Sequence, residues 1–385
     1  MKALFIVQGE GRGHMTQALA LEQILIDSGH EVLCIIIGAC SGREVPAYFK
    51  KRAIAPIHTV ASPHFFYDKE GKSIHLTKTF FYNMMALPKF LKELKKIDRW
   101  VEALKPDVII NFYDIIGGFY FTFFRPKMRR ICIAHQYLAS HKEFPFAEGF
   151  PFQKACFTTT NRLTSLAAHK TIALSFKHYQ SDHEKTTIAP PLLRKEVFEL
   201  SPTQGDYILA YVVNAGYAFE IMEWHEQNKK IKLHCFWDNK EQADGWSPWK
   251  NITFHQINDQ KFLGMMENCL GYISTAGFES ICEAMYLGKP AMMVPVENQY
   301  EQACNALDAV KSGAGIASTQ FYLEPLLNYL STHDYKDLME FQLWVKSTKQ
   351  IILNVLEHEV SISKKRKTKL TLTYQRIRML LSKPS

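Results

Sequence analysis

A glycine-rich turn that ends in a histidine lies near the start of the chain. Residues 9–14 read GEGRGH, directly after the apolar run LFIV at 4–7 and before an amphipathic stretch that begins near residue 16. A glycine turn between a strand and a helix either holds an anion at the helix N-terminus or lets a ligand approach the backbone closely. The sequence therefore predicts a ligand-facing turn, and the role of His14 is open at this point.

Two known phosphate-binding patterns fit this turn poorly. A P-loop requires Gly-Lys and then Ser or Thr after four spacer residues, and GEGRGH lacks that ending. The turn partly fits the dinucleotide pattern G-x-G-x-x-G, but its third glycine is displaced by one position. The acid expected at the end of the second strand is also absent, because that strand ends at Gly38 and Glu31 lies at its start. A nicotinamide-nucleotide site is therefore the weaker alternative.

A second constellation lies in residues 274–306, which read STAGFESICEAMYLGKPAMMVPVENQYEQACNA. A strand is expected to end at Ser274 and a helix to start at Gly277, where unpaired backbone amides suit a diphosphate. Glu283 lies six residues further along that helix, and its carboxylate can accept both hydroxyls of a ribose. Gln302 and Asn305 are three residues apart on one face of the next helix, and amide side chains suit hydroxyl-rich ligands.

The elements that would position these residues alternate strand and helix along the chain. Residues 2–37 predict a βαβ unit, and the same alternation restarts after a proline-containing segment at 189–206. The sequence therefore predicts an α/β protein with two Rossmann-like, doubly wound domains facing each other across a cleft, where such sheets bind ligands. We expect an N-terminal domain at 1–200, a C-terminal domain at 201–355, and a basic segment at 356–385 that packs back on the first domain.

Individual elements follow from apolar runs and amphipathic stretches. The expected helices include 16–28, 84–104, 259–268 and 277–288, and the expected strands include 207–213, 232–237, 251–257, 271–274 and 291–296.

The ordered set of residues at 274–306 resembles the nucleotide-sugar-binding signature of GT-B glycosyltransferases of the family-28 and family-1 type. These families include the peptidoglycan N-acetylglucosaminyltransferase and the UDP-glycosyltransferases. The resemblance implies that Glu283 binds the ribose and that Gln302 and Asn305 lie beside the donor sugar. It further implies a diphosphate contact and a base contact from the residues that match the family's order, namely Arg194, Asn214, Gly216, Ile257, Ala276, Gly277 and Phe278.

The same resemblance gives the first turn a role on the acceptor side. In these enzymes the loop ends in Gly-His under the acceptor, so His14 is the candidate general base that removes a proton from an attacking hydroxyl. The alternative is that His14 only positions the acceptor or orients the loop. Acceptor contacts are expected from Gly11, Arg12, Gly13 and His135; Arg12 departs from the family-28 pattern, and His135 could equally be a core histidine.

The resemblance implies an inverting glycosyltransferase that uses a nucleotide diphosphate sugar, most simply a UDP-sugar, as a substrate. We expect no metal and no cofactor, because helix amides and Arg194 would stabilise the leaving diphosphate. The chain has no Asp-x-Asp triplet to hold a metal ion. Two alternatives remain open: a nucleotide-sugar epimerase of GT-B shape, for which no obvious pair of acid/base carboxylates is found, and a non-catalytic nucleotide-sugar-binding protein.

Composition indicates a globular protein with a mild preference for anionic partners. The 385 residues are 47% hydrophobic and 22% charged, with a formal net charge of +8. No signal peptide or membrane span is apparent, and the eight cysteines fit reduced core thiols, so we expect a cytoplasmic protein. The Lys- and Arg-rich segment 361–385 is a candidate for a membrane-surface contact or for a solvated, charged end. The aromatic, basic segments 64–73 and 78–83 are candidates for a lipid or sugar platform or for ordinary packing. No nucleic-acid partner is expected.

Overall fold

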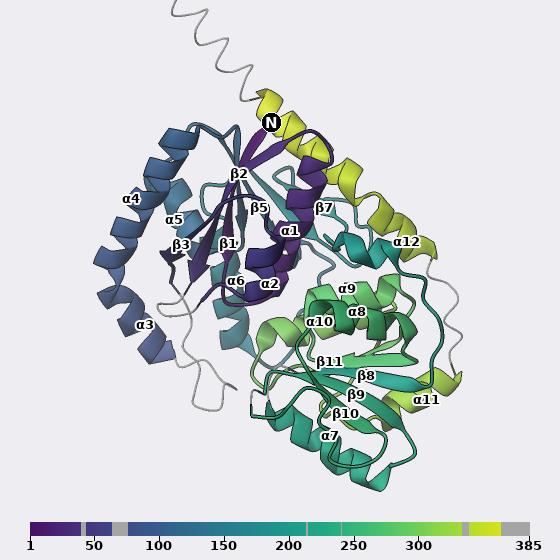
Figure 1. Cartoon of the computed structure of the whole chain (residues 1–385). Coiled ribbons are helices and arrows are strands. Elements are labelled where there is room, and N and C mark those ends of the chain that lie inside the picture. Colours follow the sequence, from purple (N-terminus) through teal and green to yellow (C-terminus); the bar gives the residue numbers. More distant parts are fainter. Residues whose placement is uncertain (40–43, 64–75, 213–214, 240, 333–338, 363–385) are drawn as a thin grey trace, which may run out of the picture.

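Two parallel β-sheets, each covered by helices, form the computed structural model of the chain (Figure 1). The structure describes residues 1–39, 44–63, 76–212, 215–239, 241–332 and 339–362. Every pair of neighbouring strands in the two sheets is parallel. The predicted α/β class with two doubly wound sheets is therefore confirmed.

The first sheet has the strand order β3-β2-β1-β4-β5-β6-β7. Its strands are β1 (Lys2–Gln8), β2 (Glu31–Ala39), β3 (Ile57–Ala61), β4 (Val108–Phe112), β5 (Arg129–Ala134), β6 (Lys170–Leu174) and β7 (Thr186–Ala189). Its helices are α1 (Gly13–Ile26), α2 (Ala47–Arg52), α3 (Leu76–Met85), α4 (Leu87–Leu104), α5 (Ile115–Phe123), η1 (His135–Ser140) and α6 (Pro151–Thr164). All five residues of β4 are buried, as expected for a parallel strand covered on both faces.

The second sheet has the order β10-β9-β8-β11-β12-β13 and follows a link that contains η2 (Lys195–Glu199). Its strands are β8 (Tyr207–Val212), β9 (Lys232–Trp237), β10 (Ile252–Gln256), β11 (Gly271–Ser274), β12 (Ala291–Met293) and β13 (Gly315–Ala317). Its helices are α7 (Ala215–Gln227), α8 (Asp259–Asn268), α9 (Phe278–Tyr286), α10 (Tyr300–Lys311) and α11 (Glu324–Thr332). The predicted strands at 232–237 and 271–274 and the predicted helix at 259–268 match residue by residue.

The expected single helix at 84–104 is wrong in one respect, because the structure has two helices there. α3 ends at Met85 and α4 begins at Leu87, with Pro88 in the first turn of α4. Proline is tolerated in a first helical turn, where its missing N–H has no partner to lose, but it interrupts a helix that arrives from before it. The predicted amphipathic pattern of α4 is confirmed, since Phe90, Leu94 and Ile97 are buried on one face.

The C-terminal helices return to the first domain (Figure 1). α12 (Met339–Lys346) and the helical residues 348–362 follow the second sheet in sequence. Trp344 donates from Nε1 to the carbonyl oxygen of Ser175 at 3.1 Å, and Glu359 pairs with Arg129. Trp344 precedes residue 356, so part of this packing against the first domain lies before the predicted basic segment at 356–385. The remaining basic segment, 363–385, lies outside the described residues, and the expected domain boundaries stay predictions.

Both sheets change their direction of growth at one point, between β1 and β4 in the first and between β8 and β11 in the second. Crevices form beyond the carboxyl ends of strands at such points. The turn that follows β1 and the turn that follows β11 are the two stretches from which the sequence predicted ligand contacts. The topology therefore directs both stretches to ligand-binding edges.

Candidate active site

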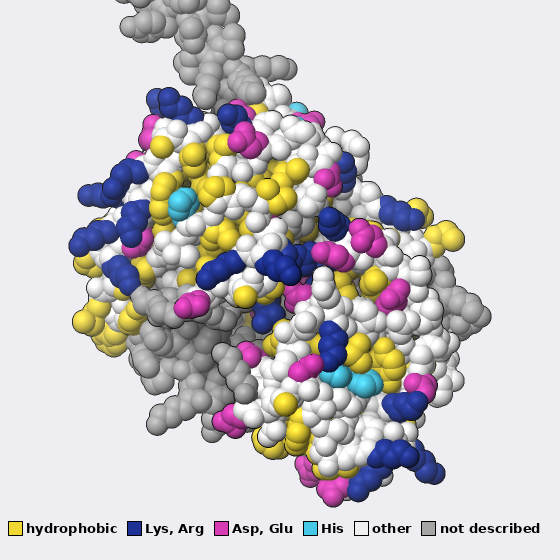
Figure 2. Space-filling view, viewed as in Figure 1, with side chains coloured by type: hydrophobic (Ala, Val, Ile, Leu, Met, Phe, Trp, Pro, Cys, Tyr) yellow, Lys and Arg dark blue, Asp and Glu magenta, His cyan; other side chains and the backbone are white. Residues whose placement is uncertain are grey.

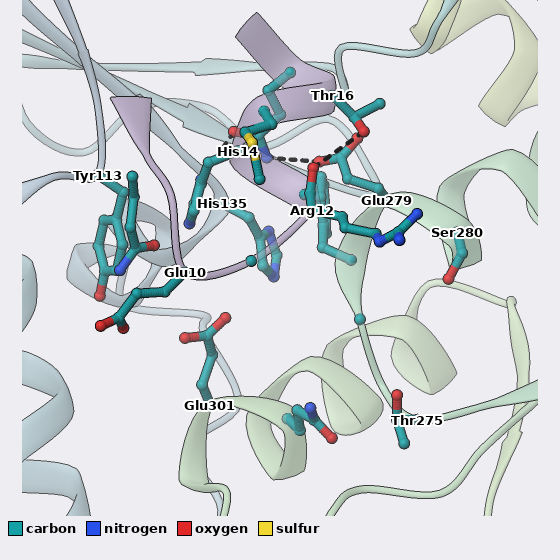
Figure 3. Close-up of a pocket in the computed structure, with 18 of the residues that line it drawn as sticks. Glu10, Arg12, His14, Thr16, Tyr113, His135, Thr275, Glu279, Ser280 and Glu301 are labelled. Atoms are coloured by element: carbon teal, nitrogen blue, oxygen red, sulfur yellow. Dashed lines mark hydrogen bonds between the residues drawn. The ribbon is translucent and has the colours of Figure 1, made fainter. Parts of the chain in front are cut away.

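A large pocket of about 1100 Å³ lies between the two domains at the carboxyl ends of both sheets. The first domain contributes residues after β1, β4 and β5, and the second contributes residues after β9, β10, β11 and β12. Figure 3 shows Glu10, His14 and Tyr113 approaching the cavity from one domain, and Thr275, Glu279 and Glu301 from the other. Eleven of the predicted residues line it: Gly11, Arg12, Gly13, His14, His135, Arg194, Ile257, Gly277, Phe278, Glu283 and Gln302.

The glycine turn folds tightly against the neighbouring strand before α1 begins. The amide of Gly9 donates to the carbonyl oxygen of Gly38 at 2.8 Å. A Cβ atom at Gly9 would lie 2.7 Å from that oxygen, so only glycine allows this approach. At Gly13 a Cβ atom would lie 3.5 Å from Cγ of Glu279 in the second domain. The turn therefore brings the start of α1 into direct contact with the opposite domain.

His14 is buried in the first turn of α1, with a partner for each ring nitrogen. Nδ1 lies 3.2 Å from Oε1 of Gln17, and Nε2 lies 3.3 Å from Nε2 of Gln136. The ring stacks on Tyr113 with a centroid separation of 5.2 Å. Burial lowers the pKa of His14 to about 4, although the hydrogen bond to Gln17 opposes this shift. The imidazole is therefore neutral at pH 7, as a general base must be before it takes a proton.

Tyr113 reaches its position through an unusual backbone conformation. Its φ of 61° lies in the left-handed region, which large side chains rarely adopt. The ring packs beside His14, and the hydroxyl donates to Oδ1 of Asn161 on α6. Strained residues of this kind concentrate at functional sites, where the surrounding structure holds them. Tyr113 thus forms a fixed wall of the pocket next to the imidazole.

Two carboxyl groups of the second domain reach the glutamines that hold His14. Oε1 of Glu279, in the first turn of α9, accepts from Nε2 of Gln17 at 2.5 Å. Oε1 of Glu301, in the first turn of α10, accepts from Nε2 of Gln136 at 2.8 Å. Burial raises the pKa of both carboxyls, that of Glu279 to about 8. Glu279 is therefore largely protonated at pH 7, which reduces its repulsion of an anionic ligand.

The N-terminus of α9 offers an anion site in the same pocket. Gly277 is the N-cap residue and provides no side chain to occupy the free amides of the first turn. Thr275 and Ser280 add hydroxyl groups on either side, and all three residues line the pocket. A helix N-terminus carries roughly half a positive charge, so this end of α9 can bind a phosphate.

Glu283 and Arg194 form a buried ion pair at the edge of the pocket. Arg194 Nε donates to Oε1 of Glu283 at 2.6 Å, and Arg194 Nη2 donates to Oε2 at 2.8 Å. Both residues are at least nine-tenths buried. The sequence assigned these two residues to different parts of the donor, whereas the structure joins them in one bidentate unit. Since each carboxylate oxygen has a second lone pair, Glu283 can still accept from a ligand.

The remaining predicted donor residues are distributed unevenly. Gln302 lines the pocket, and its Oε1 accepts from the amide of Val296 at 2.9 Å. Asn305 is buried behind the lining and donates to the carbonyl oxygen of Ala276 at 3.2 Å. Ala276 and Gly216 are also outside the lining. Asn214 lies outside the described residues. The donor roles of these residues stay predictions.

His135 and Arg12 connect the domains on the first-domain side. The ring of His135 stacks on Phe278 with centroids 3.9 Å apart, and Nδ1 donates to the carbonyl oxygen of Leu174. Burial lowers the pKa of His135 to about 4. The guanidinium of Arg12 lies over the ring of Tyr48 and 3.8 Å from a carboxylate oxygen of Asp259. Both residues line the pocket and simultaneously serve interdomain packing.

Sequence reasoning missed Gln17, Gln136, Glu279 and Glu301. Glu279 and Glu301 stood inside the quoted stretch at 274–306, and their place in the first turn of a helix after a strand was the available signal. Gln17 is one helical turn from His14 and therefore shares its face. For Gln136 no local signal existed, because its partners are 122 and 165 residues away.

No group of three or more His, Cys, Asp or Glu side chains among the described residues is arranged to hold a metal ion. None of the described helices combines the length and the apolar character required to cross a bilayer.

Comparisons with known proteins point to one family. A family model described as glycosyl transferase family 1 matches residues 1–332. No curated protein matches the chain in sequence.

Solved glycosyltransferase structures match the fold over nearly the whole chain. The glycotransferase of kitacinnamycin is 14% identical, with a TM-score of 0.64 over 93% of this chain and 98% of that one. UGT73P12 of Glycyrrhiza uralensis, complexed with glycyrrhetinic acid 3-O-monoglucuronide, is 11% identical, with a TM-score of 0.61 over 98% and 99%. MurG of Acinetobacter baumannii is 19% identical, with a TM-score of 0.52 over 94% and 99%. These likenesses confirm the predicted two-domain GT-B fold.

Proposed function

Since the chain belongs to glycosyl transferase family 1, and is therefore a glycosyltransferase enzyme, we propose that it transfers a sugar from a UDP-linked donor to an acceptor hydroxyl with inversion. The observation that carries this proposal is the single pocket into which His14 and the N-terminus of α9 both project. One end offers a neutral imidazole, and the other offers free amides and hydroxyls.

In the proposed reaction the acceptor oxygen attacks the anomeric carbon of the donor sugar. The hydroxyl proton passes to Nε2 of His14 as the new glycosidic bond forms and the bond to the nucleotide diphosphate breaks. The free amides in the first turn of α9, with the hydroxyls of Thr275 and Ser280, stabilise the charge on the leaving diphosphate. That charge also favours the protonated form of the imidazole, so donor binding raises the pKa of His14 toward neutrality.

Glu283 is the proposed ribose contact, with Arg194 as the group that fixes it. The bidentate geometry holds the carboxylate in one orientation, and its remaining lone pairs can accept two adjacent hydroxyls. A contact from Arg194 to phosphate would require the guanidinium to leave Glu283. We therefore propose that α9 supplies most of the diphosphate stabilisation, without a metal ion.

The acceptor side of the pocket combines aromatic and acidic groups. Phe152, Phe157 and Tyr48 line it, together with Glu10 and Glu44. Flat apolar rings suit the faces of sugars or of lipid and aromatic aglycones, and carboxylates accept from hydroxyls. A sugar, lipid-linked or small-molecule acceptor therefore fits this chemistry.

The proposal is tested by assaying nucleotide release and glycoside formation with a panel of nucleotide sugars and acceptors. In the presence of EDTA we expect UDP release from at least one UDP-sugar. The anomeric configuration of the transferred sugar in the product should be inverted relative to the donor. Conversion of the donor to an epimer without any acceptor would instead indicate an epimerase. Donor binding with neither reaction in any acceptor mixture would indicate a binding protein.

A membrane contact is a second proposal, supported by one surface of the first domain. α3 and the start of α4 expose five large apolar side chains: Phe81, Met84, Met85, Leu87 and Leu91. Exposed basic side chains of α4 adjoin them: Lys89, Lys92, Lys95, Lys96 and Arg99. Figure 2 shows hydrophobic and basic side chains along the edge where Figure 1 places α3 and α4. Apolar groups beside cations suit the surface of an anionic bilayer.

Vesicle flotation tests this contact. We expect co-flotation with phosphatidylglycerol-containing vesicles and loss of binding with pure phosphatidylcholine. The double substitution Met85→Ser and Leu87→Ser should weaken binding, whereas Leu307→Ser, which changes an exposed leucine on the other domain, should not. Equal binding by both variants would contradict the assignment to α3 and α4.

A further inference from the structure

Two glutamines of the first domain each connect His14 to a carboxyl group of the second domain. Gln17 joins Nδ1 of His14 to Glu279, and Gln136 joins Nε2 of His14 to Glu301. The two bridges use different helices on the far side, α9 and α10. The candidate base is therefore held from both ring nitrogens by contacts that cross the domain interface.

The carboxyl groups determine which way each amide faces. In the structure Oε1 of each carboxyl faces the NH₂ end of an amide, and this oxygen accepts whether it belongs to a carboxylate or is the carbonyl oxygen of a protonated carboxyl. The NH₂ group of Gln17 faces Oε1 of Glu279, which leaves its carbonyl oxygen toward Nδ1 of His14. An oxygen at that position requires a proton on Nδ1.

The contacts of Gln136 indicate the same tautomer of His14 from the other ring nitrogen. The NH₂ group of Gln136 faces Oε1 of Glu301 at 2.8 Å and also faces Nε2 of His14 at 3.3 Å. A donor at that position requires Nε2 to carry a lone pair. Because both bridges agree, the hydrogen-bond network assigns one tautomer, with the proton on Nδ1 and the lone pair on Nε2.

We propose that Gln17 and Glu279 are positioning residues that fix His14 in the tautomer with a basic Nε2, and that this base is set only while the two domains are in contact. The inference rests on the proposed role of His14 as general base. Glu279 belongs to the helix proposed to bind the donor diphosphate, so the same element that receives the donor also orders the base. A wrong histidine tautomer removes general-base catalysis even when the side chains stay in place.

The alternative is that the Gln17–Glu279 hydrogen bond only joins the domains. In that case its removal would lower thermal stability and leave both the turnover number of the folded enzyme and the histidine tautomer unchanged. The two explanations therefore differ in readouts other than stability.

The main test replaces Gln17 by Met, which has similar length but no amide. We expect Gln17→Met to lower kcat by about 10- to 100-fold, with the KM for the donor changed by less than about 3-fold. The matched control is Gln23→Met on the same helix, since the side chain of Gln23 donates to Asp27 and lies outside the pocket lining. Equal kcat for Gln17→Met and wild type would overturn the proposal.

Two substitutions of Glu279 give the converse test. Glu279→Met removes the acceptor for Gln17 and should reduce kcat as Gln17→Met does. Glu279→Gln retains an oxygen that can accept the same bond, so it should recover most of that loss. Equal loss of kcat in both variants would contradict the role of the hydrogen bond and point to the acidity of Glu279 instead.

A spectroscopic measurement separates this proposal from the proposed function. The ¹⁵N shifts of labelled histidine report the tautomer directly, and the His14 signals are assigned by their absence in His14→Ala. We expect the Nδ1-protonated form in the wild type and a mixture of tautomers in Gln17→Met. If the wild type shows that tautomer but no glycosyl transfer, the proposed function fails alone; a mixture in the wild type overturns the positioning proposal even in an active enzyme.

Discussion

The N-termini of α1 and α9 approach the same pocket from opposite domains and present different chemistry to it. Each helix follows a strand beside the switch point of its sheet, and each is preceded by a turn with glycine. α1 carries His14, whose ring nitrogens face two amides. α9 has Gly277 at its N-cap and hydroxyl groups alongside. Free helix amides are common to both ends, so the neighbouring side chains distinguish the two sites.

This difference explains why the glycine-rich turn is not the proposed phosphate site. Its glycines permit a close approach to β2 and to α9, as Gly9 and Gly13 show. At α9 the pocket has free space in front of Gly277, where an added Cβ atom would meet nothing within 4 Å. Gly11 in the first turn is equally open, so the hydroxyl groups of Thr275 and Ser280 beside Gly277, rather than the space around the glycines, favour the second site.

The largest expected effect is on the α1 side. Replacing His14 by Ala should lower kcat by about 10²- to 10⁴-fold, because the acceptor hydroxyl loses its proton acceptor. Donor affinity, measured by calorimetry, should stay nearly unchanged. His183→Ala, which alters an exposed histidine, serves as the control. If His14→Ala transfers sugar as fast as the wild type, the fold assignment stands but His14 is not the general base.

The next largest effect is expected at α9. Glu283→Ala should raise the KM for the donor by at least about 10-fold, because the ribose contact is lost. It should also cost about 3–5 kcal/mol of stability, because Arg194 is left buried without its partner. Donor titration and thermal unfolding measure the two effects. Glu223→Ala, at an exposed carboxylate, is the control. An unchanged donor affinity would show that the ribose site lies elsewhere.

The pH dependence sharpens the contrast between an ordinary histidine and His14. Burial lowers the pKa of this imidazole to about 4, so the neutral form persists as the pH falls from 7 to 5. We expect kcat/KM, which reports the free enzyme, to hold on the acid side until about pH 4 while the protein remains folded by circular dichroism. The groups around the ring are Gln17, Tyr113 and Gln136, with Glu279 and Glu301 behind the amides. An acid limb near pH 6.5 would mean a solvated imidazole.

The smallest effect is expected from the ion pair between Arg12 and Asp259. Both side chains are partly exposed and their charged atoms are 3.8 Å apart, so solvent screens the attraction. A double-mutant cycle with Arg12→Ala and Asp259→Ala should give a coupling of about 0.2–1 kcal/mol in unfolding free energy. A much larger coupling would indicate that this pair, rather than the His14 bridges, holds the domains together.

Much of the fold followed from local pattern. The all-buried strands, the amphipathic face of α4 and the alternation of strand and helix predicted two doubly wound domains, because burial on both sides of a parallel strand demands continuous apolar runs. The helix predicted at 84–104 is interrupted near Pro88, because hydrophobic periodicity alone does not show where a proline ends one helix and starts the next.

The candidate site was only partly predictable. His14, Gly277 and Glu283 were identified from their order after strands and turns together with the resemblance to GT-B glycosyltransferases. Their pairings were not predicted, although Arg194 itself was named as a donor contact. The pairing of Glu283 with Arg194 spans 89 residues, and that of Gln17 with Glu279 spans 262. No local rule relates positions so far apart, since only the packing of two domains brings them together.

The sequence by itself determined the helices and strands, their alternation in each domain, and the helix N-termini at which His14 and Gly277 lie. These depend on interactions within a few residues, such as turn geometry and hydrophobic periodicity. The tertiary structure decided which carboxyl faces which amide, which groups lost their water, and hence the pKa values of His14 and Glu279. Desolvation and directed hydrogen bonding depend on distance in space, and in this protein that distance is set across the interface between the domains.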